Sequence, residues 1–385
     1  MAQIASAFPT AGGLYHWGSL LGNRGFGWAT AWFNLLGLVF VCASVNFGVY
    51  DPFFKTLVAP ALGLDTSHWG QAQQLTFLAA ITAVQALLNH RFLPLTARLV
   101  DLSGYLIFAV TILLIGALWL WARPADSGLP DFARLVTYTN FSGAEGSQWP
   151  AMQSTVKVFL CGLLLTVYTI TGFDASAHTA EETHDAASNV PKGIISSVVW
   201  SGLFGFALVA TFLLVMPDLA RGVALGSGYF AALLANLPAG VRVMLSLLLF
   251  IANFLCGLAC LLSTSRMVFA FARDGGLPFS GSLSRVEPGH GAPVAAIWSA
   301  AIASLAMTVY ADAFAVLATA CAVFLYVSYV MPVLAGLIAE GGRWQRKGPF
   351  SLGAWSKPVA VLAVMGGMTL IWVGIQPPND KVSTL

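Results

Sequence analysis

The stretch that decides the fold is VYTITGFDASAHTAEET, residues 167–183. An apolar run leads into it, and threonine, glycine, aspartate and serine then interrupt what would otherwise be an apolar helix. Gly172 loosens the backbone, while Thr169, Thr171 and Ser176 offer hydroxyls to the backbone groups that an unwound helix frees. Such an interruption predicts a discontinuous helix that crosses a membrane and holds a polar ligand where it breaks.

The composition places most of the chain in lipid. Of its 385 residues, 58% are hydrophobic and only 9% are charged, against about 25% charged residues in a soluble domain. A soluble protein this apolar could not cover its surface, so we predict a polytopic membrane protein with the lipid bilayer as its partner. A net charge of +2 without any basic run argues against a nucleic-acid partner.

Nine stretches are apolar over the length that a membrane helix needs, which is about 20 residues. Because they are continuously apolar and lack alternation, they predict helices rather than the strands of a β-barrel. The expected fold class is therefore an all-α polytopic membrane protein with about nine spans, the sixth longer than a bilayer requires. The stretches are residues 27–49, 72–89, 102–122, 156–178, 194–216, 241–268, 293–310, 313–338 and 357–375.

The basic residues indicate the orientation. One short predicted loop, residues 343–357, concentrates arginine and lysine, whereas the basic residues on the opposite side are spread along a longer loop. The positive-inside rule then places Met1 on the cytoplasmic side, and nine spans place the C-terminus outside. Met1 is not followed by a basic region and a clean apolar core, so we expect no signal peptide.

Signatures of soluble enzymes, such as a Walker loop, HExxH or GxSxG, are absent, so we expect no enzyme. The five cysteines lie within apolar stretches and predict neither a disulfide framework nor a metal site, and no cofactor is indicated.

Polar residues at membrane depth are costly and therefore informative. Asp174 either belongs to a binding site at the broken helix or lies at the cytoplasmic membrane surface, where it ends the helix. Asn253, within a stripe of small and polar residues in the sixth stretch, either contributes to a site or packs against another helix.

Three motifs resemble the amino acid–polyamine–organocation permease superfamily, and within it the group of GABA and choline permeases. The most specific is TGFDASAHTAEET at residues 171–183, followed by NVPKGI at residues 189–194. ASAFPTAGGLY at residues 5–15 and ARDGGLP at residues 272–278 agree with it in order and spacing, as does the Ser265-Arg266 pair.

The resemblance covers essentially the whole chain and implies one transmembrane permease domain over residues 1–385. Twelve helices are usual in this superfamily, and the first ten form two inverted repeats of five. On that pattern the nine stretches correspond to helices 3–11, and residues 1–8 to the end of helix 2. The chain then looks incomplete at both ends, without helices 1 and 12.

The resemblance also implies a binding site on the discontinuous helix. Tyr168 lies near an aromatic that gates the site from outside. Asp174 lies beside the unwound segment, where it takes part in proton coupling or contacts a cationic amine. The implied substrate-binding residues are Tyr168, Thr171, Gly172, Phe173, Asp174 and Asn253.

The implied function is secondary active transport. We expect the protein to import an amino acid or a related amine, such as GABA, across the plasma membrane by alternating access, with H+ as the coupling ion. Because no ATP site is visible, an ion gradient or exchange must supply the energy. The alternative is a non-transporting truncated permease fragment that lacks half of the substrate site.

Overall fold

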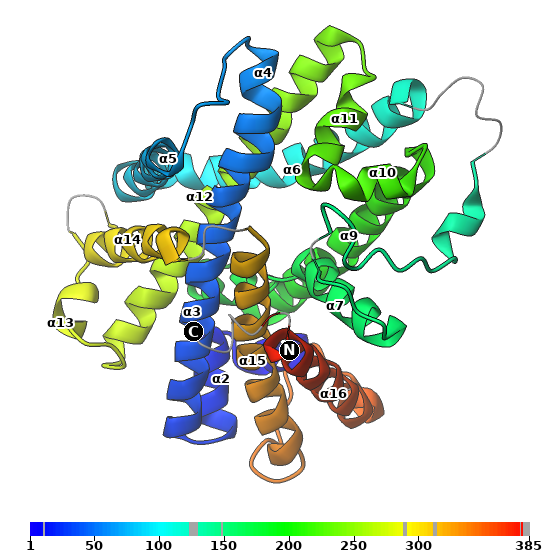
Figure 1. The fold of residues 1–385 in the computed structure, drawn as a ribbon. Coiled ribbons are helices and arrows are strands. Elements are labelled where there is room, and N and C mark those ends of the chain that lie inside the picture. The colour runs from blue at the N-terminus through cyan, green and yellow to red at the C-terminus, as the bar shows by residue number, and fades with distance from the viewer. Residues whose placement is uncertain are drawn as a thin grey trace.

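A computed structural model describes residues 1–10, 12–122, 130–147, 149–287, 291–310, 314–377 and 379. These residues form helices and connecting turns, with no strand among them (Figure 1). The predicted all-α polytopic class is confirmed, because six helical segments are long and apolar enough to cross a membrane. They are α3–η1–α4 (Arg24–Ala61), α6–η2 (Leu93–Ala122), α9 (Ala186–Val215), α12 (Ala239–Arg273), α15 (Phe314–Ala339) and η6–α16 (Gly353–Ile375).

The three remaining apolar stretches are helical too, but they are shorter, broken or more polar. They form α5 (Gln71–Arg91), α7 (Thr155–Tyr168) with α8 (Ala175–His178), and α14 (Val294–Tyr310). Each of the nine stretches thus contains a helix, whereas the number of spans and the inverted repeat stay predictions. Residue 313, the expected start of the eighth span, lies outside the described residues.

Short helices complete the fold. Two of them precede the first long helix. The short elements are α1 (Ala2–Ala7), α2 (Gly13–Leu21), η3 (Phe132–Leu135), η4 (Ala180–Glu182), α10 (Leu219–Ala224), η5 (Gly226–Gly228), α11 (Tyr229–Ala235) and α13 (Ser280–Leu283).

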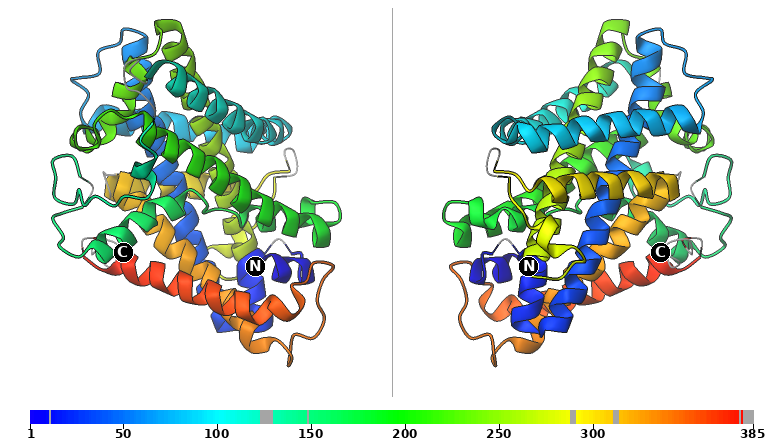
Figure 2. Two further views of the ribbon diagram at one scale, coloured as in Figure 1. Left: turned by 90° about the vertical axis from the view of Figure 1, so that its right-hand side faces the viewer. Right: turned by 90° about the vertical axis from the view of Figure 1, so that its left-hand side faces the viewer.

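Helix α3 (Arg24–Gly48) is the central element, with α2, α12, α14 and α15 packed along it (Figures 1 and 2). In the most apolar part of its segment 78% of the residues are buried, against 11% for α9, so α3 lies in the protein core and α9 at the periphery. Its contact with α15 includes the stacked rings of Phe40 and Phe324, whose centroids lie 5.6 Å apart. Small residues such as Gly37 let the two helices approach closely.

The first span is longer than predicted. The helix does not stop near residue 49 but continues through the π-helical stretch η1 (Val49–Val58) into α4 (Ala59–Ala61). Pro52 lies inside η1, and because proline has no N–H and crowds the preceding turn, the wider π turns accommodate it. The sixth span exceeds the bilayer as predicted: the 35 residues of α12 are about 50 Å long, against about 30 Å of hydrocarbon.

Candidate functional site

The predicted break is present. Helix α7 ends at Tyr168 and α8 begins at Ala175, and turns connect them over residues 169–174. Gly172 adopts φ +92°, a left-handed conformation that residues with a Cβ atom rarely adopt. Thr171 donates from its hydroxyl to the Val167 carbonyl at 2.9 Å, so it satisfies a backbone group that the break frees.

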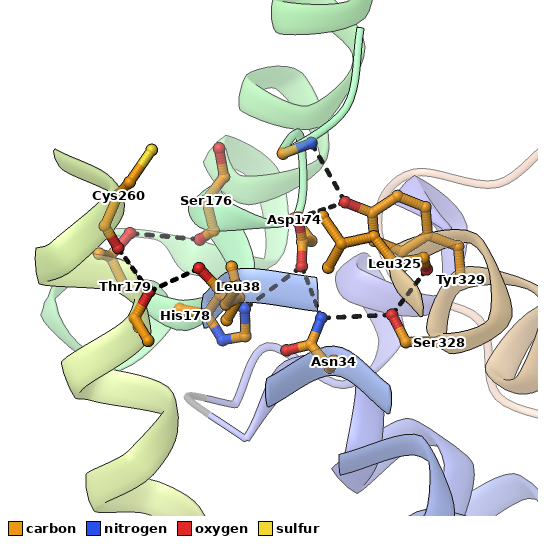
Figure 3. A network of polar contacts seen from close by, with 12 residues as sticks. Asn34, Leu38, Asp174, Ser176, His178, Thr179, Cys260, Leu325, Ser328 and Tyr329 are labelled. Atoms are coloured by element: carbon orange, nitrogen blue, oxygen red, sulfur yellow. Dashed lines mark hydrogen bonds and ion pairs between the residues drawn. The ribbon is translucent and has the colours of Figure 1, made fainter. Parts of the chain in front are cut away.

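Asp174 is the centre of the site (Figure 3). It is fully buried and begins α8, so it neither ends a helix nor lies at an exposed surface. Tyr329 of α15 donates to its Oδ1 atom at 2.7 Å, and Asn34 of α3 donates to its Oδ2 atom at 3.0 Å. His178, one turn further along α8, places Nε2 at 3.3 Å from the same Oδ2 atom. Three helices therefore meet at one carboxylate.

Tyr329 and Asn34 extend this network. The Tyr329 hydroxyl accepts the Gly172 N–H at 3.1 Å, and its ring packs on Phe173 with centroids 4.6 Å apart. The Asn34 amide also donates to the Ser328 hydroxyl at 3.3 Å. The unwound segment is thus tied to α15 by backbone, ring and carboxylate together.

Two polar atoms in this network have no partner among the described residues. They are Asn34 Oδ1 and His178 Nδ1, and both are buried. Buried polar atoms are nearly always hydrogen-bonded, so atoms without a partner mark where water or a polar ligand can bind.

Tyr168 and Asn253 lie at a second level, further along α3. The Tyr168 hydroxyl lies 2.6 Å from Ser44 Oγ, and Asn253 donates to the neighbouring Val45 carbonyl at 3.4 Å. Ser44 follows Asn34 by ten residues, which is about 15 Å along a helix. The structure therefore gathers Gly172, Phe173 and Asp174 but places Tyr168 and Asn253 on another level.

A cavity of about 530 Å³ borders the break. Phe173 and Tyr329 form part of its wall, and the rest is mainly apolar side chains of α7, α9, α15 and α16. Its volume lies in the range of small-molecule sites.

A polar cluster at the end of α12 lies close to α2 and α8. The Tyr15 hydroxyl of α2 donates to Asp274 at 2.7 Å, while Arg273 pairs with Glu181 at 3.7 Å and with Asp274 at 3.5 Å. Burial and the hydrogen bond to Asp274 raise the pKa of Tyr15, which keeps this hydroxyl protonated as a donor. The cluster links the segment after α8 to α12 and α2.

Sequence reasoning missed Asn34, Ser328 and Tyr329, and it gave His178 no role. A signal existed for Asn34, which is an amide within a long apolar run of the first span. No local feature of the sequence distinguishes Tyr329 from the nearby Tyr326. Only the folded structure shows that Tyr329 is the one that contacts Asp174 at the start of α8.

A broken apolar helix with a buried carboxylate beside the break is a feature that many secondary transporters share. The comparison with known families is more specific: the amino acid permease family matches residues 1–384. The chain belongs to this family, a branch of the amino acid–polyamine–organocation superfamily.

Individual relatives agree with the family. The chain is 30% identical to the amino-acid permease BAT1 of Arabidopsis thaliana over 96% of its own length and 73% of the relative. A BAT1 homolog of Oryza sativa is 29% identical over the same shares. The GABA-specific permease of Saccharomyces cerevisiae is 28% identical over 79% of the chain and 53% of the relative.

Proposed function

We propose that the protein is a secondary active transporter that imports an amino acid or a related amine, such as GABA, with H+ as the coupling ion. It acts by alternating access as a single transmembrane domain of the plasma membrane, with residue 1 on the cytoplasmic side. The observation that carries the proposal is the buried Asp174 at the break between α7 and α8.

The break supplies groups that fit an amino acid. Backbone N–H and carbonyl groups freed at residues 169–174 can bind the carboxylate and ammonium ends of a zwitterion, as in other discontinuous membrane helices. Gly172, Thr171 and Phe173 would surround the substrate at this level. Tyr168 would close the site from outside, and Asn253 would act at the second level along α3.

A proton rather than ATP fits the driving force. Asp174 and His178 are titratable, buried and adjacent, and a carboxylate in such a place can change its charge during a transport cycle. The relatives support an amino acid as substrate, and the GABA-specific permease among them supports a related amine. The comparisons do not favour the fragment alternative. A transporter also fits the family better than an enzyme does.

Transport by the purified chain in liposomes tests the proposal. With an acidic exterior, we expect labelled amino acids or GABA to accumulate inside, and a protonophore should abolish the accumulation. Uptake that does not depend on the pH gradient would reject proton coupling but not transport. Failure to take up any member of an amino acid and amine panel, under either gradient, would reject transport and favour the fragment alternative.

A further inference from the structure

The Asp174 carboxylate has no accessible side for a substrate amine. Tyr329 binds one of its oxygens, and Asn34 and His178 bind the other. None of the carboxylate is exposed, and the facing His178 side chain is only 1% exposed. The group therefore connects helices to one another, and its charge must be balanced within the protein.

Among the described residues, His178 is the only side chain in contact with Asp174 that can carry a positive charge. Asn34 and Tyr329 contribute neutral donors, which solvate a carboxylate but do not cancel its charge. Because the two side chains share a hydrogen bond, one proton belongs to the pair, whichever atom holds it. With that proton the pair is neutral overall, and without it a bare negative charge is buried.

We propose that Asp174 and His178 form a proton-operated latch that fastens α8 to α3 and α15. This inference rests on the proposed transport function and names the pair that carries its proton. With the proton bound, the latch is closed. When the pair loses the proton to water, the uncompensated carboxylate draws in solvent, and α8 separates from α3 and α15 together with α9, against which it packs.

The ring nitrogen Nδ1 of His178 is the exit point for the proton. Nε2 faces Asp174, whereas Nδ1 is buried and has no partner among the described residues. It lies beside Gly13 at the start of α2, where a side-chain Cβ atom would come within 3.8 Å of it. Glycine at this position keeps the approach to Nδ1 free for a water molecule. The proton leaves Nδ1 for that water, and Nε2–H still donates to Asp174.

The elements that contact α8 or Asp174 carry other titratable groups. On α15 these are a tyrosine and a thiol, and α3 contributes only the neutral Asn34. On α2, His16 carries a second imidazole and therefore needs a control. Helix α12 and η4 contribute arginines and carboxylates. These groups are Tyr329, Cys321, Tyr15, His16, Arg266, Arg273, Asp274 and Glu181.

The test measures the opening directly by pulsed electron spin resonance. Spin labels on the exposed Lys192 of α9 and Ile338 of α15, in a cysteine-free chain in lipid nanodiscs, report the distance between the two helices. Between about pH 5.5 and 8, the ratio of open to closed populations should rise about tenfold per pH unit near its midpoint, as one proton requires. His16→Gln and the exposed His184→Gln should leave this profile unchanged.

Three variants should give different pH profiles. In Asp174→Asn the carboxylate is gone, so protonated His178 becomes the uncompensated charge, and opening should increase as the pH falls. The double variant with His178→Gln has no charge left and should not respond to pH. His178→Gln alone removes the balancing cation and should move the midpoint to lower pH.

A wild-type distance that does not change with pH would overturn the latch, as would an Asp174→Asn profile with the wild-type direction. If Asp174→Asn does not fold, a His178→Gln midpoint equal to that of the wild type overturns it instead. Uptake in liposomes separates the two proposals. A working latch without uptake rejects transport, whereas uptake with a pH-independent distance rejects only the latch.

Discussion

One hydroxyl, that of Tyr329, serves both the carboxylate of Asp174 and the broken backbone beside it. It donates to Asp174 at 2.7 Å and accepts the Gly172 N–H at 3.1 Å. The position of α15 is therefore coupled to the conformation of the unwound segment, although 155 residues separate the two side chains.

Tyr329→Phe should weaken both the fold and the site. The variant keeps the ring that packs on Phe173 but leaves the buried Asp174 carboxylate and the half-buried Gly172 N–H without their shared partner. We expect a loss of about 1–3 kcal/mol in stability, seen as a lower melting temperature in detergent, together with slower uptake. Tyr105→Phe, at a side chain that is 78% exposed on α6, is the matched control. A melting temperature of Tyr329→Phe equal to that of this control would contradict the expectation.

Gly172→Ala tests whether the break depends on a left-handed residue. No atom lies within 4 Å of the added Cβ, so the cost is conformational: about 1–2 kcal/mol for φ +92°. The substitution should lower the melting temperature and reduce uptake.

Gly162→Ala is its control, because this glycine lies within α7 and its Cβ would also meet open space. In a helix interior alanine is favoured over glycine by about 0.5–1 kcal/mol, so this variant should be as stable as the wild type or more so. If both variants shift the melting temperature alike, the backbone conformation of Gly172 is not what matters.

The sequence could predict the helices and the break because both are local properties. Apolar length marks a span, and a glycine among threonines marks an interruption. The C-terminal limit of the first span was harder to predict. Pro52 suggests that the helix ends there, whereas the helix continues past it through the π turns of η1.

The composition of the Asp174 cluster could not be predicted, because its partners come from helices far apart in the chain. Asn34 lies 140 residues before Asp174, and in an apolar helix no hydrophobic periodicity reveals which face turns inward. Asn253 shows the same limit: as a lone amide it fits both a site and a packing contact, and the structure gives it a carbonyl of α3 as partner.

The pairing of Asn46 with Gln85 should be a main attachment of α5, the least apolar of the nine predicted spans. The two buried amides exchange both hydrogen bonds at 2.9 Å, and Gln85 also donates to the Phe254 carbonyl at 3.1 Å. Gln85→Met leaves the Asn46 amide without its main partner and should cost about 1–3 kcal/mol.

A double-mutant cycle with Asn46→Leu measures the coupling. The double variant should lose clearly less than the sum of the two single variants, because no unpaired amide remains. Melting temperatures in one detergent give all four corners of the cycle. Strict additivity would show that the amides do not depend on one another.

Glu340 should make the fold sensitive to acid. Burial alone would raise the pKa of Glu340, but hydrogen bonds from Lys347 at 2.6 Å and Ser356 at 2.9 Å outweigh it and hold the pKa below its ordinary value of 4.5. A carboxyl whose folded pKa is lowered contributes stability above its unfolded pKa, and this contribution disappears as the pH falls through the folded value. The melting temperature of the wild type should therefore decrease more than that of Glu340→Gln when the pH is lowered from about 6 to 4.

Since other carboxyl groups titrate in both proteins, the difference between the two melting temperatures is the relevant quantity. Glu145→Gln, at an exposed loop position, should show no such difference from the wild type, and an equal acid response of Glu340→Gln and the wild type would refute this role of Glu340.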